Sequence, residues 1–79
     1  MKYIYILQSI NFTNKFYTDL TSDLKRRISE HNQGKSIHTN KHVPWKLKTY
    51  IAFSDEQKAF EFERYLKTSS GRAFTKKRL

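Results

Sequence analysis

The sequence predicts an α+β fold in which helices flank a small, three-stranded and mainly antiparallel sheet. Two segments rich in β-branched and aromatic residues come first, a later segment alternates apolar and polar residues, and helical patterns separate and follow them. The expected order is strand, strand, helix, strand, helix, helix. We expect residues 1–79 to form one domain, because so short a chain buries a single modest core.

The first two strands are expected at residues 3–7 and 16–20. Residues 3–7 are aromatic or aliphatic throughout, which is typical of a strand that is covered on both faces and lies at the centre of a sheet. The polar segment between the strands, residues 8–15, has no hydrophobic periodicity and is long enough to reverse the chain. The second strand should therefore pair antiparallel with the first.

A helix should follow, beginning after Ser, Thr and Asp residues that can act as N-caps and ending at Gly34 in a left-handed conformation. Leu24 and Ile28 mark its apolar stripe, and Arg27 and His31 belong to the same stripe by their spacing. Arg27 and His31 should therefore lie on or beside the face that is turned toward the sheet. The other side chains are expected on a solvated face: Lys25, Arg26, Ser29 and Glu30.

The third strand is predicted at Trp45–Phe53, where the alternation places one face on the core and leaves the other partly wet. Ser54 and Gln57 have the spacing of a capping box, so the next helix should begin with Ser54 as its N-cap. The segment 69–71 should end that helix. Residues 72–78 should then form a short basic helix.

Glu63 falls in the apolar stripe of the helix after the third strand, four residues beyond Ala59. An unpaired buried charge costs several kcal/mol, so this carboxylate should be paired or bound to a metal. Two interpretations stay open. One is a salt bridge to a Lys or Arg, for which Arg27 is a candidate, and the other is a functional metal ligand.

The other unusual residues also have ordinary structural explanations. Arg27 can extend past the stripe to water, and His31 can be a structural histidine at a helix end. Tyr5 and Tyr17 can be packing residues of the strands. His38 and His42 lie in a polar loop without a carboxylate or thiolate beside them, so we expect loop or phosphate contacts rather than a metal site.

The charge of the chain predicts a polyanionic partner. Sixteen Lys and Arg against seven Asp and Glu give a net charge of +9, which favours nucleic acid over a merely basic soluble domain. The basic residues are spread along the chain, which disfavours a membrane-surface helix, and no apolar run could cross a bilayer. The absence of cysteine excludes disulfides and thiolate metal sites and fits a reducing, cytoplasmic location.

Hydrolysis of a phosphodiester needs a base for water, a cation for the developing charge and usually a divalent metal at the leaving oxygen. Tyrosine hydroxyls, one arginine and one carboxylate could supply this set if they meet on one side of the sheet. A single carboxylate favours one hydrated Mg²⁺, with Mn²⁺ as the alternative.

In their order along the chain, these residues resemble the GIY-YIG endonuclease superfamily, in particular its small single-domain bacterial branch. Residues 3–5 stand at the first motif, with Tyr5 as its tyrosine, and residues 17–19 stand at the second. The later motifs follow in order and extend the resemblance over nearly the whole chain: residues 24–34 with Arg27 and His31, residues 44–47, residues 59–67 with Glu63, and residues 70–72.

The resemblance implies a metal-dependent endonuclease that acts on DNA in repair or processing and leaves 5′-phosphate and 3′-hydroxyl ends. It implies that Tyr5 is the general base on water and that Tyr17 orients the water or the phosphate. It also implies that Arg27 stabilises the developing charge with the help of His31, and that Glu63 holds Mg²⁺. RNA is an alternative substrate, and a homodimer or a protein partner could add selectivity, because so small a domain makes few base contacts. The expected nucleic-acid contacts are Lys25, Arg26, Lys35, His38, Lys41, Lys67, Arg72, Lys76 and Lys77.

The chain departs from the family pattern at two glycines. Tyr3 replaces the glycine of the first motif, a change that the branch commonly shows, and Asp19 replaces that of the second. Glycine at the second position suggests a special backbone angle or a close approach to phosphate, and aspartate can adopt a left-handed conformation but carries a charge that repels phosphate. Asp19 is therefore either an added metal ligand or a cause of weakened cleavage. The alternative functions are a non-catalytic nucleic-acid-binding module with the same fold and, less strongly supported, a protein-interaction domain.

Overall fold

The computed structural model describes residues 1–79 and has a three-stranded, fully antiparallel sheet in the order β2-β1-β3. The strands are β1 (Lys2–Ser9), β2 (Phe16–Thr21) and β3 (Trp45–Phe53). The four residues at the middle of β1 are each at most 2% exposed. The predicted α+β class and the central position of the first strand are therefore confirmed.

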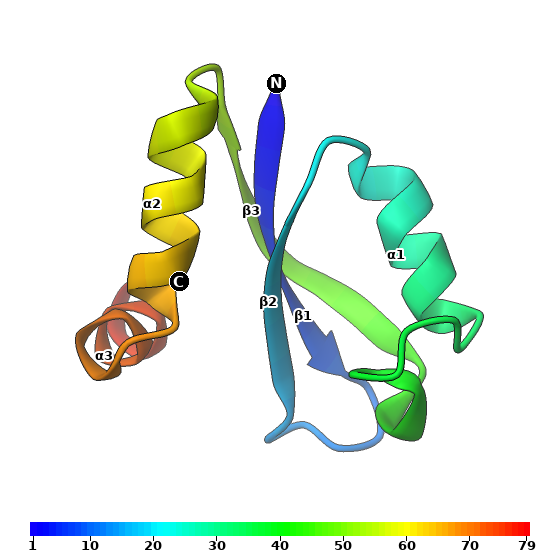
Figure 1. Cartoon of the computed structure of the whole chain (residues 1–79). Coiled ribbons are helices and arrows are strands. Elements are labelled where there is room, and N and C mark those ends of the chain that lie inside the picture. The colour runs from blue at the N-terminus through cyan, green and yellow to red at the C-terminus, as the bar shows by residue number, and fades with distance from the viewer.

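The helices cover both faces of the sheet. α1 (Leu24–Asn32) lies on one face, whereas α2 (Glu56–Leu66) and α3 (Ser69–Arg78) lie on the other, as Figure 1 shows. A short 3₁₀ turn, η1 (Asn40–His42), connects the α1 side to β3. None of the helices is both long and apolar enough to traverse a lipid bilayer.

Alternation along β1 separates two cores. Tyr5 and Leu7 pack with Trp45 and the partly buried residues of α1, and these residues form the core on that face. Ile6 points to the opposite face, where it lines a hollow together with Leu66 from the end of α2. The period of two in a fully covered strand thus supplies apolar side chains to both layers.

The ends of α1 follow the predicted capping chemistry. The Asp23 side chain accepts the Arg26 N–H at 3.1 Å, and Gly34 has φ 76. The Gly34 N–H donates to the His31 carbonyl at 3.0 Å and the Lys35 N–H donates to the Glu30 carbonyl at 3.1 Å, which is the Schellman arrangement. Glycine is favoured here because a left-handed residue without Cβ carries no steric penalty.

Two predicted boundaries on the other face are wrong. The N-cap of α2 is Asp55 rather than Ser54, because the Asp55 carboxylate accepts the Lys58 N–H at 3.1 Å. Gly71 lies inside α3 and does not end α2, since Thr68 caps α3 and accepts the Gly71 N–H at 3.1 Å. The physical reason for a glycine here is contact, because a Cβ on Gly71 would overlap the backbone of residues 65 and 66.

The sequence predicted that the apolar residues of β3 all face one core, but in the structure they are divided between the two faces of the sheet. The register shifts by one residue between Ile6 and Leu7 of β1, whose partners on β3 are Thr49 and Leu47. Lys48 is the extra residue of this bulge, so Trp45 and Leu47 before it face α1, whereas Ile51 and Phe53 after it face α2. One strand therefore contributes to the packing on both faces of the sheet.

Candidate active site

A buried chain of hydrogen bonds runs through the middle of the α1 face. Nε2 of His31 lies 2.8 Å from the Tyr5 hydroxyl, and Nδ1 of His31 lies 2.6 Å from the Thr39 hydroxyl. All three residues are 0% exposed. We call this chain the Tyr5–His31–Thr39 relay. It joins the central strand, the last turn of α1 and the loop before η1.

His31 is neutral in this setting. Burial lowers its pKa below the usual value, and the positive charge of Arg27 lowers it further, while Asp19 and Glu30 act in the opposite direction. A neutral imidazole has one donor and one acceptor nitrogen. Either Tyr5 donates to Nε2 while Nδ1–H donates to Thr39, or both bonds run in reverse. In both cases each ring nitrogen has a hydrogen-bond partner, so burial of the His31 ring leaves no unsatisfied polar atom.

Tyr5 carries its proton at neutral pH. Burial raises its pKa to about 12, even though the neighbouring Arg27 guanidinium lowers it. Asp19, which pairs with Tyr5 across the sheet, also raises it. The phenolate form is therefore scarce, and Tyr5 can take a proton from water only if its own proton leaves toward His31.

Tyr17 and Asp19 form a second hydrogen-bonded pair on the same face. The Tyr17 hydroxyl donates to Asp19 Oδ2 at 2.9 Å, and the Leu20 N–H donates to Oδ1 at 2.8 Å. Burial raises the pKa of Tyr17 first, and the bond to Asp19 raises it further. The Tyr17 ring also meets the rings of His31 and His38, with centroids 5.1 Å and 6.2 Å away.

Asp19 occupies its motif position without unusual backbone geometry. No residue other than glycine has a positive φ, and Asp19 lies within β2 opposite Tyr5. Aspartate is therefore compatible with the fold at this position without a left-handed backbone. What it changes is the charge beside the two tyrosine hydroxyls.

Arg27 supplies the positive charge of the cluster. Its guanidinium lies 3.3 Å from Glu30 Oε1, and both side chains are about one-third exposed. Burial works against its charge, but the nearby Tyr5 hydroxyl and Glu30 raise its pKa above the usual value. Glu30 thus contacts a site residue and does not belong only to a solvated face, because α1 turns its side chain back toward Arg27.

Glu63 lies on the other side of the sheet from the Tyr5–His31–Thr39 relay. It is 8% exposed on α2, and its carboxylate pairs with the Lys67 ammonium at 2.6 Å. Of the two interpretations of Glu63, the salt bridge is present, with Lys67 rather than Arg27 as the partner.

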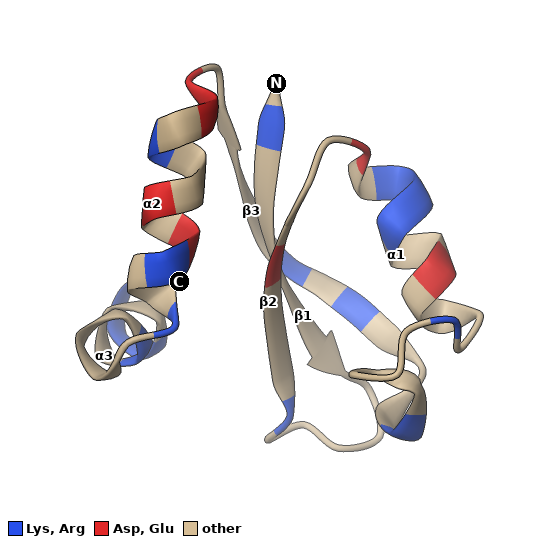
Figure 2. Cartoon of the chain, viewed as in Figure 1, with Lys and Arg blue, Asp and Glu red and all other residues tan.

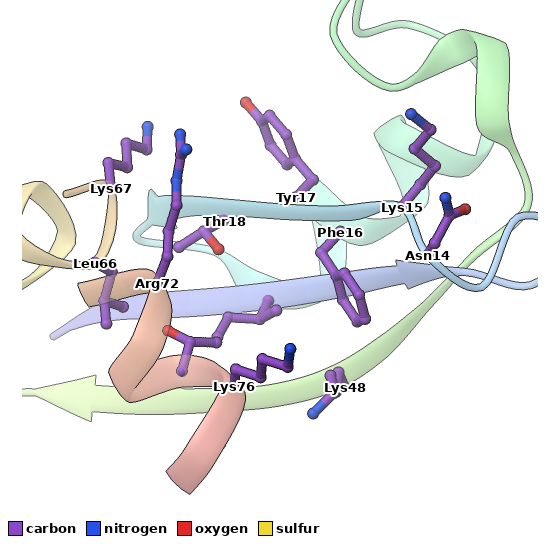
Figure 3. A pocket seen from close by; sticks show the side chains of 12 residues that line it. Asn14, Lys15, Phe16, Tyr17, Thr18, Lys48, Leu66, Lys67, Arg72 and Lys76 are labelled. Carbon is purple, nitrogen blue, oxygen red and sulfur yellow. The ribbon is translucent and has the colours of Figure 1, made fainter. Parts of the chain in front are cut away.

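One groove connects the two sides of the sheet. Tyr17 and Lys67 both line a groove of about 690 Å³ at β2, an edge strand. In Figure 3 the side chains of Tyr17, Lys67 and Arg72 extend to the same side of β2. Glu63 is therefore one ion pair away from a groove that a site tyrosine borders.

The predicted nucleic-acid contacts are all exposed and form two groups. Figure 2 shows basic residues on α1, on α3 and along β3. On the α1 side and in the loop that follows are Lys25, Arg26, Lys35, His38 and Lys41, and on the α2–α3 side are Lys67, Arg72, Lys76 and Lys77. The structure contains no group of three His, Cys, Asp or Glu residues that could hold a metal ion.

The sequence did not indicate two of the groups in the cluster. Thr39 completes the hydrogen bonds of His31, but a threonine in a polar loop carries no distinctive signal. Glu30 could have been found, because a carboxylate three residues after an arginine on a helix is a frequent ion pair.

The fold corresponds to that of a known class of protein. The model of the GIY-YIG catalytic domain matches residues 1–78, and the chain therefore belongs to the GIY-YIG family. Its relatives are small. It is 36% identical over 72 residues to the UPF0213 protein SAG0778 of Streptococcus agalactiae serotype V, covering 90% of this chain and 80% of that protein.

Further relatives carry the same designation. The UPF0213 protein SpyM3_1077 of Streptococcus pyogenes serotype M3 is 33% identical over 72 residues, which cover 90% of this chain and 76% of that protein. The solution NMR structure of the UPF0213 protein BH0048 from Bacillus halodurans matches with a TM-score of 0.58 and 32% identity, covering 96% of this chain and 81% of that one. The sequence-based resemblance and fold are thus confirmed.

Proposed function

We propose that this protein is a metal-dependent endonuclease that hydrolyses DNA phosphodiesters by attack of water, in DNA repair or processing. The observation that carries the proposal is the Tyr5–His31–Thr39 relay with Arg27 beside it, in a chain that belongs to the GIY-YIG family. A buried hydroxyl bonded to a neutral imidazole is a proton path, and a cation beside it suits a phosphate.

In the proposed reaction, Tyr5 and His31 act together as the base. Because Tyr5 is 0% exposed, water would reach its hydroxyl only after the neighbouring Arg27 side chain moves toward the phosphate. That water would attack phosphorus and give its proton to the Tyr5 oxygen as the Tyr5 proton moves to His31 Nε2, 2.8 Å away. The P–O bond to the 3′ oxygen breaks, and that oxygen takes a proton from solvent water to become the 3′-hydroxyl. The pair accepts one proton in total, so the reaction needs His31 to be neutral, which its lowered pKa favours.

Arg27 would neutralise the developing charge on the phosphate. The raised pKa of Arg27 keeps its guanidinium cationic throughout the pH range of a cleavage assay. It would exchange its present partner, Glu30 at 3.3 Å, for the phosphate oxygens. Guanidinium bonds to phosphate are charge-assisted and two-pronged, so this exchange is favourable.

Glu63 is the candidate metal ligand. A single carboxylate suits a Mg²⁺ ion that keeps most of its water and also contacts a substrate phosphate, and it does not suit an all-protein cage. Lys67, 2.6 Å from the Glu63 carboxylate, would move toward the phosphate when the ion binds. The metal would supply stabilisation of charge at the leaving oxygen.

Incubation with linear, nicked and branched DNA, with and without Mg²⁺ or Mn²⁺, tests the proposal. We expect cleavage that requires metal and is lost in Tyr5→Phe, Arg27→Ala and Glu63→Gln, while DNA binding persists. Lys58→Ala is the matched control, because Lys58 is an exposed lysine of α2 outside the groove. Cleavage that Tyr5→Phe leaves unchanged would contradict the role of the Tyr5–His31–Thr39 relay.

A second candidate is a non-catalytic nucleic-acid-binding module with the same fold. The observation that favours it is Asp19, whose carboxylate holds the Tyr17 hydroxyl at 2.9 Å and brings negative charge to the place where a phosphate would lie. Binding to every DNA without cleavage in either metal would favour this candidate.

The variants Asp19→Gly and Asp19→Asn measure the effect of this charge. Both remove the repulsion, and we expect both to raise the cleavage rate. Asp19→Asn preserves the side-chain shape, so it separates charge from backbone freedom. Equal or lower rates in both variants would refute the repulsion, and lower rates would indicate a positive role for the Asp19 carboxylate.

A further inference from the structure

The groove on the α3 side of β2 is strongly basic. Five cationic side chains line it and no carboxylate does: Lys15, Lys48, Lys67, Arg72 and Lys76. They come from the loop before β2, the bulge of β3, the end of α2 and α3, as Figure 3 shows. Elements that are distant in the sequence therefore direct the same charge into one hollow. We refer to this hollow as the basic groove.

Most of these charges lack a partner within the protein. Lys67 pairs with Glu63, and the Lys48 ammonium donates to the Leu79 carbonyl oxygen at 2.6 Å. The other three cations form no ion pair and no side-chain hydrogen bond. Like charges that line one low-dielectric wall repel one another, and a polyanion relieves that repulsion while it gains several contacts at once.

An aromatic ring lies at the wall of the basic groove. Phe16 is 51% exposed although it belongs to β2, and its ring points to the side of the sheet on which Lys48 and Lys76 lie (Figure 3). A ring of this kind beside several cations is the combination that binds single strands, because an unpaired base can stack on the ring while phosphates contact the cations. The bases of a duplex are already paired and stacked, so a duplex could not use Phe16.

We propose that the basic groove binds a single-stranded segment of nucleic acid, with a base stacked on Phe16 and phosphates on Arg72 and Lys76. The inference rests on the proposed function in one respect. Tyr17 borders the basic groove and also contacts the ring of His31, so a strand in the groove would continue toward the Tyr5–His31–Thr39 relay. The substrate class would then be DNA with an unpaired segment next to the scissile bond.

Binding in the presence of a chelator tests the groove without any contribution from cleavage. The probe is a fluorescent oligothymidylate of about ten nucleotides, compared with a blunt duplex of equal length by anisotropy at several salt concentrations. Log affinity falls with log salt, and Arg72→Glu and Lys76→Glu should each make this negative slope shallower by about 0.7 for the single strand. Phe16→Leu keeps an apolar side chain without the ring and should weaken binding of the oligothymidylate roughly 5- to 150-fold.

The control is Lys58→Glu, which makes the same change of charge on α2 outside the basic groove. We expect Lys58→Glu to bind the oligothymidylate almost as tightly as the wild type does, with a small loss of affinity that is equal for the single strand and the duplex. Thermal unfolding establishes that each variant is folded. Phe16→Leu binding equal to wild type, or groove variants that behave like Lys58→Glu, would overturn the proposal.

Cleavage is measured separately, which keeps the two proposals distinguishable. Single-strand binding that depends on the basic groove, without hydrolysis of any DNA, would refute the proposed nuclease activity and support the proposed binding in the groove. Hydrolysis that Phe16→Leu and Arg72→Glu leave unchanged on nicked and branched DNA would refute the groove and support the nuclease.

Discussion

Replacement of His31 by glutamine tests whether the buried imidazole is neutral in the folded protein. His31 is 0% exposed, with its two nitrogens 2.8 Å and 2.6 Å from the hydroxyls of Tyr5 and Thr39. The amide of a glutamine can donate to one hydroxyl and accept from the other. His31→Gln should therefore preserve much of the packing while it removes a group that titrates.

The sign of the effect follows from the direction of the pKa shift. Burial lowers the pKa of His31 in the folded protein below its unfolded value of about 6.5. The stability that His31 contributes is then fully present above about pH 6.5 and is lost as the pH falls toward the folded pKa, because the unfolded chain takes up a proton first. Where the unfolded chain binds one more proton than the folded protein, the free energy of unfolding falls by at most about 1.4 kcal/mol for each pH unit of acidification.

Urea unfolding between about pH 7.5 and about pH 5 measures the effect. We expect the wild type to lose more stability over this range than His31→Gln, by up to about 1.4 kcal/mol for each pH unit below about 6.5. For a domain of this size, each kcal/mol corresponds to about 4–8 °C in Tm. The carboxylates are common to both proteins, so their contribution cancels in the comparison.

The matched control is His38→Gln, which removes an exposed histidine that stacks on Tyr17. It shows whether the result for His31→Gln is specific to the buried imidazole. If His31→Gln and the wild type lose the same stability on acidification, the inference that buried His31 is neutral is refuted. The proposed direction of proton transfer is then refuted as well.

Three further predictions concern stability and are measured by chemical denaturation. Gly71→Ala should cost about 1–3 kcal/mol or more, because its Cβ would overlap the Tyr65 carbonyl oxygen; a neutral result would show that α3 can shift away. Asn32→Ala should cost about 1–3 kcal/mol, since its side chain bonds both the N–H and the carbonyl of Trp45, at 2.6 and 3.0 Å. Asp23→Ala should cost about 1 kcal/mol by removing the α1 N-cap, and an unchanged midpoint would contradict that role.

Much of the fold could be predicted from local patterns. The aliphatic and aromatic run in β1 indicated a central strand because only a strand covered on both faces needs apolar side chains at every position. The stripe of α1 placed Arg27 and His31 on the sheet-facing side because helical spacing fixes which residues share a face. Packing of α1 on the sheet then brings these two residues toward Tyr5 and Tyr17.

The partners of these residues could be predicted less well. The pairing of Glu63 with Lys67 has the i, i+4 spacing of a common helix ion pair, so it was accessible from the sequence. The contact between His31 and Thr39 depends on how the loop after α1 closes, and loop closure has no periodic signal. Polar loop residues of one type look alike in the sequence whether they end up exposed or buried.

The sequence by itself determined which segments are strands and helices, which α1 residues face the sheet, and that the chain would suit an anionic partner. Tertiary structure alone decided that one bulge residue, Lys48, divides the apolar side chains of β3 between two cores and places an ammonium in the basic groove. The physical reason is that periodicity is a property of neighbouring residues. A register shift depends on the partner strand, which becomes a neighbour only when the chain folds.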